Sequence, residues 1–185
     1  MIHNQIKTVF LEIATVLERI NPDEMEAICA LITDARTVFV TGAGRSGYMM
    51  RAFAMRLMHL GIEAYYIGDT TTPSAKENDV LIIGSGSGET NSLKGYAVQA
   101  RAIGLKIALI TGSPSSALME LADASMKIPA PTPKNRNGAE FDSAQPMANL
   151  FEQCLLITCD VLVLMLMEKK MTNASEMFLH HANLE

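Results

Sequence analysis

Short apolar stretches rich in β-branched residues alternate with longer amphipathic stretches along most of this chain. Five of the apolar stretches predict strands, and they span residues 37–42, 63–68, 79–86, 106–112 and 124–130. The segments between them are helical in pattern and their connections are short, which favours parallel strands joined by right-handed crossovers. The pattern therefore predicts an α/β fold: a doubly wound five-stranded parallel sheet with helices on both faces, of the flavodoxin-like kind.

A chain of 185 residues suits a single domain. We expect extra helices at both ends of the core, so that the chain divides into N-terminal helices (1–36), a parallel core (37–128), a proline-rich loop (129–146) and C-terminal helices (147–185). The last part should hold a long helix over 147–170 and a final helix over 173–185. The long helix is apolar nearly all round, which one small sheet cannot cover. An oligomer is therefore expected.

Composition argues against several classes of protein. The net charge is −5 and the basic residues are scattered, so there is no footprint for nucleic acid. Three cysteines without C-x-x-C spacing, in a chain without a leader-like start, indicate reduced thiols and a cytoplasmic location. The most apolar run, 154–167, is shorter than a membrane span and contains Asp160, which we expect to be a paired acid of the core.

Two of the predicted strands end in loops of glycine and small hydroxyl residues, "GAGRSG" at 42–47 and "GSGSGET" at 84–90. Each loop opens a helix, whose first turn offers unpaired N–H groups and a partial positive charge. Such a turn is an anion site, and Ser85, Ser87 and Thr90 add neutral donors. The second loop is therefore predicted to hold a phosphoryl group. The alternative is a solvated loop in which Ser85 and Thr90 only cap helices.

The first loop also matches the G-x-G-x-x-G fingerprint of dinucleotide sites. Asp69 is the acid that such a site would use, although its placement after the second strand is imperfect. A dinucleotide does not need the second loop, and that loop lacks the lysine of a P-loop. A nucleotide-dependent oxidoreductase is therefore an alternative that depends on the fingerprint of the first loop alone.

Taken together, "TGAGRSG", "SGSGETNS", "QPMANLFEQ" and the terminal "HHANLE" resemble the SIS (sugar isomerase) domain family, and within it the 6-phospho-3-hexuloisomerases. The similarity runs from about Val38 to Glu185. It implies that the sugar is contacted by Ser46 and that the phosphate is held by Ser85, Gly86, Ser87, Gly88, Glu89 and Thr90.

The resemblance also implies a reaction, in which D-arabino-3-hexulose 6-phosphate becomes fructose 6-phosphate. A base takes the proton from C2, an enediolate forms, and the proton returns to C3; no metal and no redox cofactor is expected. The implied partner is 3-hexulose-6-phosphate synthase, in formaldehyde fixation by the ribulose monophosphate pathway, and the implied assembly is a homotetramer. The alternatives are a non-catalytic sugar-phosphate sensor, since SIS domains also serve regulators, and an isomerase of another sugar phosphate.

Glu152 is the candidate base, because it stands at the family's glutamate position in "NLFEQCLL". Its neighbours Phe151 and Leu155 predict apolar surroundings, which would strengthen a carboxylate as a base. Without the resemblance, the residues around Glu152 favour a partly exposed glutamate at the side of a helix over a base.

Three further side chains are candidates for moving protons or balancing charge. The terminal motif favours His181 for proton transfer, and in related SIS isomerases a histidine from a neighbouring subunit often completes the pocket. Two histidines near a chain end, such as His180 and His181, are otherwise usually exposed and without a catalytic role. His59 is a second candidate, with capping of a helix end as its alternative. Arg45 could neutralise the enediolate or phosphate, or only pair with a carboxylate.

Overall fold

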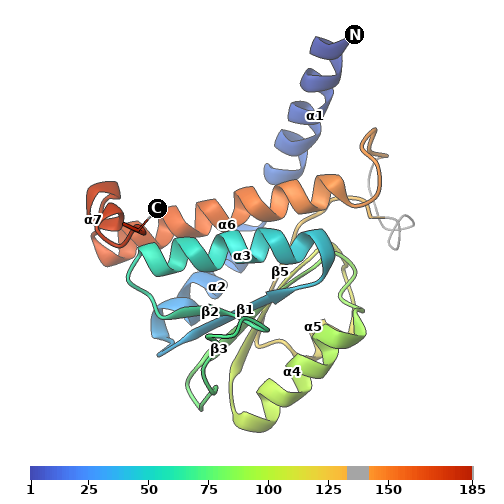
Figure 1. The fold of residues 1–185 in the computed structure, drawn as a ribbon. Coiled ribbons are helices and arrows are strands. Elements are labelled where there is room, and N and C mark those ends of the chain that lie inside the picture. Colours follow the sequence, from blue (N-terminus) through green and yellow to red (C-terminus); the bar gives the residue numbers. More distant parts are fainter. Residues whose placement is uncertain (133–141, 185) are drawn as a thin grey trace.

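The computed structural model describes residues 1–132 and 142–184. Within these residues it has seven helices and five strands (Figure 1), which in chain order are α1 Ile2–Leu17, α2 Pro22–Asp34, β1 Val38–Gly42, α3 Gly44–His59, β2 Ala64–Tyr66, β3 Val80–Ser85, α4 Asn91–Ile103, β4 Lys106–Thr111, α5 Ala117–Leu121, β5 Ala124–Lys127, α6 Asn149–Lys170 and α7 Ala174–Phe178. Each predicted strand is present, with ends that differ by a few residues. Half of the loop expected at 129–146, residues 133–141, lies outside the described residues.

All strands pair in parallel in the order β2-β1-β3-β4-β5, which confirms the doubly wound sheet. From β1 the chain moves outward to β2 and then returns to the other side of β1 as β3. The strand order therefore reverses between β1 and β3, and the loops that follow these two strands lie side by side at the carboxyl edge. In sheets of this type, that edge is where ligands bind.

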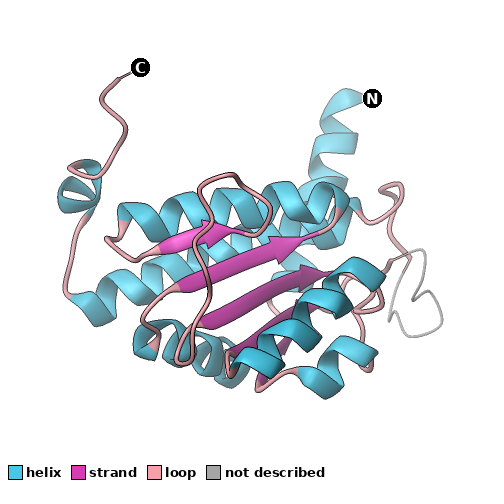
Figure 2. Cartoon of the chain, turned by 60° about the horizontal axis from the view of Figure 1, so that its bottom comes forward, coloured by secondary structure: helices cyan, strands magenta, loops and turns pink. Residues whose placement is uncertain are grey.

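Both faces of the sheet are buried, with side chains alternating between them. Val38 and Val40 of β1 join the core beneath α2, α3 and α6, whereas Phe39 points into the smaller core beneath α4 and α5. Figure 2 shows the strands between these two layers of helices. This arrangement explains why the strands read as continuous apolar runs rather than as an alternating pattern.

Two helix boundaries in the C-terminal part of the chain differ from the sequence-based expectation. Before them, α5 begins at Ala117, where the Ser116 hydroxyl caps it by accepting from the backbone N–H of Met119. The final helix predicted over 173–185 was wrong in extent: α7 stops at Phe178, and residues 179–184 leave the helix and are exposed. α6 begins at Asn149, after Met147 adopts a left-handed backbone with φ +58°.

α6 is the longest helix and packs against α1, α2 and α3 (Figure 1). Among the described residues it is the one helix long and apolar enough to cross a bilayer, and half of that stretch is buried inside the molecule. Its other side leaves Val161 and Leu164 exposed. Asp160 is exposed as well, so the expectation of a paired core acid was wrong.

Candidate active site

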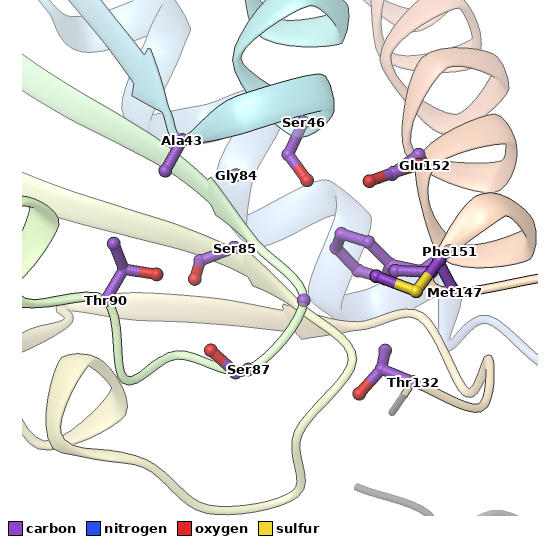
Figure 3. A pocket seen from close by; sticks show the side chains of 12 residues that line it. Ala43, Ser46, Gly84, Ser85, Ser87, Thr90, Thr132, Met147, Phe151 and Glu152 are labelled. Carbon is purple, nitrogen blue, oxygen red and sulfur yellow. The ribbon is translucent and has the colours of Figure 1, made fainter. Parts of the chain in front are cut away.

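A cavity of about 250 Å³ opens at the carboxyl edge of the sheet, where β1 and β3 lie side by side. It is lined by both glycine-rich loops, the segment after β5 and the start of α6, through Ala43, Ser46, Gly84, Ser85, Gly86, Ser87, Thr90, Thr132, Met147, Ala148, Phe151 and Glu152 (Figure 3). The structure thus brings together most of the residues that the sequence singled out.

The second loop supplies the hydroxyl groups of this cavity. Ser85 is buried, and its Oγ accepts the backbone N–H of Gly88 at 3.1 Å, which bends the loop back on itself. Gly88 has φ +66°, and a Cβ on it would lie 2.1 Å from Ser116 Oγ, so only glycine fits this turn. Thr90 occupies the N-cap position of α4 without a side-chain capping bond. Its hydroxyl is therefore not used as a cap and can serve a ligand together with the first N–H groups of α4.

Glu89 differs from its neighbours in this loop. Its carboxylate accepts the backbone N–H of Ala117 at 2.7 Å and lies 3.4 Å from Lys94 Nζ. The Ala117 N–H lowers the pKa of Glu89 below its ordinary value, and Lys94 adds to this effect. The side chain thus ties the loop to the start of α5 instead of lining the cavity, so any contact of Glu89 with a phosphate is left to its backbone.

The first loop places Ser46 on the opposite wall, whereas Arg45 next to it does not line the cavity. Gly47 lets α3 begin directly against β1, because a Cβ there would lie 2.7 Å from the carbonyl oxygen of Gly42. Ser46 is buried in this first turn. Arg45 reaches across to α6, where its Nη1 donates to the Asn149 side chain and lies 3.2 Å from Glu152 Oε2.

Glu152 projects into the cavity from the first turn of α6, and its side chain is 13 % exposed. Figure 3 shows its carboxylate and the Ser46 hydroxyl pointing toward each other, with Phe151 and Met147 beside them and Ser85, Ser87 and Thr90 across the cavity. The expectation of purely apolar surroundings was incomplete, because the Arg45 guanidinium sits beside the carboxylate. The arrangement puts hydroxyl groups and the start of α4 at one side of the cavity and the Glu152 carboxylate at the other.

The two candidate histidines lie elsewhere in the chain. His59 is buried at the last turn of α3, and its ring stacks on His181 with 5.4 Å between ring centres. Arg56 Nη1 approaches His59 Nδ1 to 3.3 Å, and both histidines line a second cavity of about 410 Å³ between α3, α6 and α7. Burial lowers the pKa of His59 below its ordinary value, and nearby Arg56, His181 and His180 lower it further.

This histidine cluster cannot meet Glu152 of the same chain. Ser46 and His59 are on one straight helix, about 20 Å apart at 1.5 Å per residue. On α6, the residues that share the second cavity with the cluster include Val163 and Leu164, about 17 Å beyond Glu152. Neither His59 nor His181 therefore reaches the first cavity of its own chain.

Some wall residues escaped the sequence reasoning. Thr132 and Met147 come from segments whose patterns indicate only a loop or a helix end. Asn149, which bonds to Arg45 but does not line the cavity, was missed as well. Phe151 was noted only as an apolar neighbour of Glu152, although its ring lies 3.2 Å from where a Cβ on Gly86 would be. Asp69, which a dinucleotide site would use, is instead paired with Arg51 at 2.5 Å.

Comparison with known proteins places this geometry in a family context. The SIS domain model matches residues 31–165. The 3-hexulose-6-phosphate isomerase of Bacillus subtilis is 43 % identical over 90 % of this chain and 89 % of its own length, and that of Mycobacterium gastri is 38 % identical over 100 % and 92 %. A crystal structure from Methanococcus jannaschii, for which a 3-hexulose-6-phosphate isomerase function was inferred, superposes with a TM-score of 0.84 at 32 % identity, over 98 % of this chain and 99 % of its own.

Proposed function

The chain belongs to the SIS domain family, and from this premise we propose that it is an isomerase that interconverts D-arabino-3-hexulose 6-phosphate and fructose 6-phosphate. The observation that carries the proposal is one cavity with a phosphate-type site on one wall and the Glu152 carboxylate on another. Relatives named for this activity match nearly the whole chain at 38–43 % identity, which supports the choice of substrate.

In the proposed mechanism, Ser85, Ser87 and Thr90 and the N–H groups at the start of α4 bind the phosphate. This fixes the far end of the sugar, so that the reacting carbons extend toward α6. Glu152 takes the proton from C2, and the negative charge spreads onto the oxygens of the enediolate. Arg45, beside Glu152, is placed to stabilise that charge, and Ser46 to hold a sugar hydroxyl.

Return of the proton to C3 completes the exchange of the carbonyl position. Hydrogen moves only within the substrate, so the reaction needs no external oxidant or reductant. A second acid–base group is required to move the proton between the O2 and O3 atoms. We assign this role to a histidine of the His59–His181 cluster, supplied by a neighbouring chain.

The proposal includes an oligomer, with a homotetramer as the expected form. The projecting half of α1 carries Ile2, Ile6 and Phe10 on one face, each at least 48 % exposed (Figure 1). Val161 and Leu164 add exposed apolar surface on α6. Contiguous exposed apolar surface of this kind marks interfaces. Light scattering at micromolar concentration tests this point, and a monomer mass would contradict it.

We place the enzyme in the cytoplasm, where it would catalyse the reaction that follows 3-hexulose-6-phosphate synthase in formaldehyde fixation. The test of the function is a coupled assay that measures fructose 6-phosphate formed from several sugar phosphates. D-arabino-3-hexulose 6-phosphate should give the highest kcat/KM. Binding of fructose 6-phosphate without any turnover would favour a sensor, and a preference for another sugar phosphate would move the chain to a different isomerase.

A further inference from the structure

Residues 143–148, the lead-in segment, connect the region before α6 to the candidate active site. The segment contains neither helix nor strand, so no regular backbone ladder holds it. It ends in Met147, which has φ +58° and is 78 % exposed, and Ala148. Both residues line the cavity, and Ala148 directly precedes α6 with Glu152 in its first turn. The shape of the cavity therefore depends on a segment that burial alone does not fix.

Glu12 of α1 holds this segment from outside the cavity. Its carboxylate accepts Ser143 Oγ–H at 2.6 Å, the Ala144 backbone N–H at 2.7 Å and Gln145 Nε2–H at 3.1 Å. Ser143 Oγ in turn accepts the backbone N–H of Gln145 at 3.0 Å. These partners are 131 to 133 positions from Glu12 along the chain. One side chain thus anchors three consecutive residues.

The charge state of Glu12 agrees with this role. Partial burial on its own would raise the pKa of Glu12, but the hydrogen bonds from Ser143, Ala144 and Gln145 outweigh it and leave the pKa below its ordinary value. The carboxylate is therefore ionised at neutral pH, when each of the three bonds is strengthened by charge.

We propose that Glu12 is a positioning residue of the active site, which fixes the lead-in segment so that Met147 and Ala148 form the cavity wall and Glu152 enters at the correct angle. Glu12 does not line the cavity itself, so it acts only through the segment. The buried face of α6 lies in the main hydrophobic core with α2 and α3, apart from this clamp, so the loss should be local. The kinetic part of the inference rests on the proposed function.

The test compares Glu12→Gln with Glu18→Gln, which makes the same change at the exposed C-cap residue of α1. Hydrogen exchange by mass spectrometry should show peptides over residues 142–150 exchanging faster in Glu12→Gln only. Peptides from the middle of α6 should be unchanged in both variants. In the isomerase assay, Glu12→Gln should lower kcat/KM about tenfold, equivalent to one charge-assisted hydrogen bond. Inhibition by inorganic phosphate, which needs only the second loop, should stay the same.

The outcomes distinguish the inference about Glu12 from the proposed isomerase function. Unchanged exchange at 142–150 in Glu12→Gln overturns the inference, even in a fully active enzyme. Equal loss of substrate turnover and phosphate inhibition also overturns it, because that result indicates general damage to the fold. A wild-type protein without isomerase activity, combined with faster exchange in Glu12→Gln, contradicts the proposed function but supports the clamp.

Discussion

α3 and α6 begin at the carboxyl edge of the sheet. Their first turns carry Arg45 and Glu152, opposite the hydroxyl groups of the second glycine-rich loop. At the far edge, the last turn of α3 places His59 beside His181, and both rings share a cavity with Val163 and Leu164 from the second half of α6. The N-terminal ends of the two helices favour anions through the helix dipole. At the histidine cluster, burial and the neighbouring Arg56 instead lower the pKa of His59 and favour its neutral form. Two kinds of acid–base chemistry are thus about 20 Å apart on shared helices, and one chain cannot combine them.

The largest expected effect is at the carboxyl edge. Glu152→Gln keeps the size of the side chain but removes its basicity, so turnover should fall about 10²–10⁴-fold with little change in substrate affinity. Glu168→Gln makes the same change at the exposed far end of α6 and should leave turnover near that of the wild type. Steady-state kinetics of both variants test this, and near-normal turnover in Glu152→Gln would exclude it as the base.

The next prediction brings the two ends together through the assembly. Glu152→Gln and His181→Ala should each be nearly inactive alone. Unfolded and refolded together, they should form mixed oligomers in which some cavities hold both wild-type groups, and activity should recover to about a quarter of the wild-type value, since catalytic groups act as a unit.

Refolding Glu152→Gln together with His59→Ala, in place of His181→Ala, tells which ring of the stacked pair takes part in catalysis. Mass spectrometry confirms that subunits have exchanged. A mixture that has exchanged but stays as inactive as its parents would show that these histidines do not complete the cavity.

A smaller effect is expected from one donor of the phosphate site. Ser87→Ala should weaken binding of fructose 6-phosphate by about 1–3 kcal/mol, the value of a hydrogen bond to a charged group. Ser175→Ala, an exposed serine on α7 at the far end, should not change affinity. In thermal shift measurements fructose 6-phosphate should stabilise the wild type and NAD should not. Stabilisation by NAD alone would favour a dinucleotide site at the first glycine-rich loop over a phosphate site at the second.

The smallest effect concerns stability at the far end. Because burial, Arg56 and the neighbouring rings lower the pKa of His59, the unfolded chain binds more protons than the folded one below the ordinary histidine pKa. The contribution to stability is complete above about pH 6.5 and is lost as the pH falls through the lowered pKa. The melting temperature of the wild type should therefore drop more between pH 7.5 and 5 than that of His59→Gln. Parallel pH profiles would contradict this assignment.

Much of the fold could be predicted because it rests on local patterns. The parallel sheet followed from β-branched runs alternating with helices, and Gly88 and Thr90 marked the turn that opens α4. Both glycine-rich loops could also be assigned to one edge, since parallel strands end together. The end of α7 was missed because residues 179–184 have the composition of a helix, whereas they lie exposed beyond it.

The sequence by itself determined the five-stranded parallel sheet, the two loops at its carboxyl edge and the short set of side chains that chemistry could use. Only the tertiary structure decided that Arg45 pairs with Glu152, that Glu89 turns to α5, that Glu12 clamps the lead-in segment, and that His181 lies far from Glu152 in its own chain. The physical reason is range. Periodicity and helix-end signals arise between residues a few positions apart, whereas Arg45 and Asn149 or Glu12 and Ala144 are brought together only when whole helices pack.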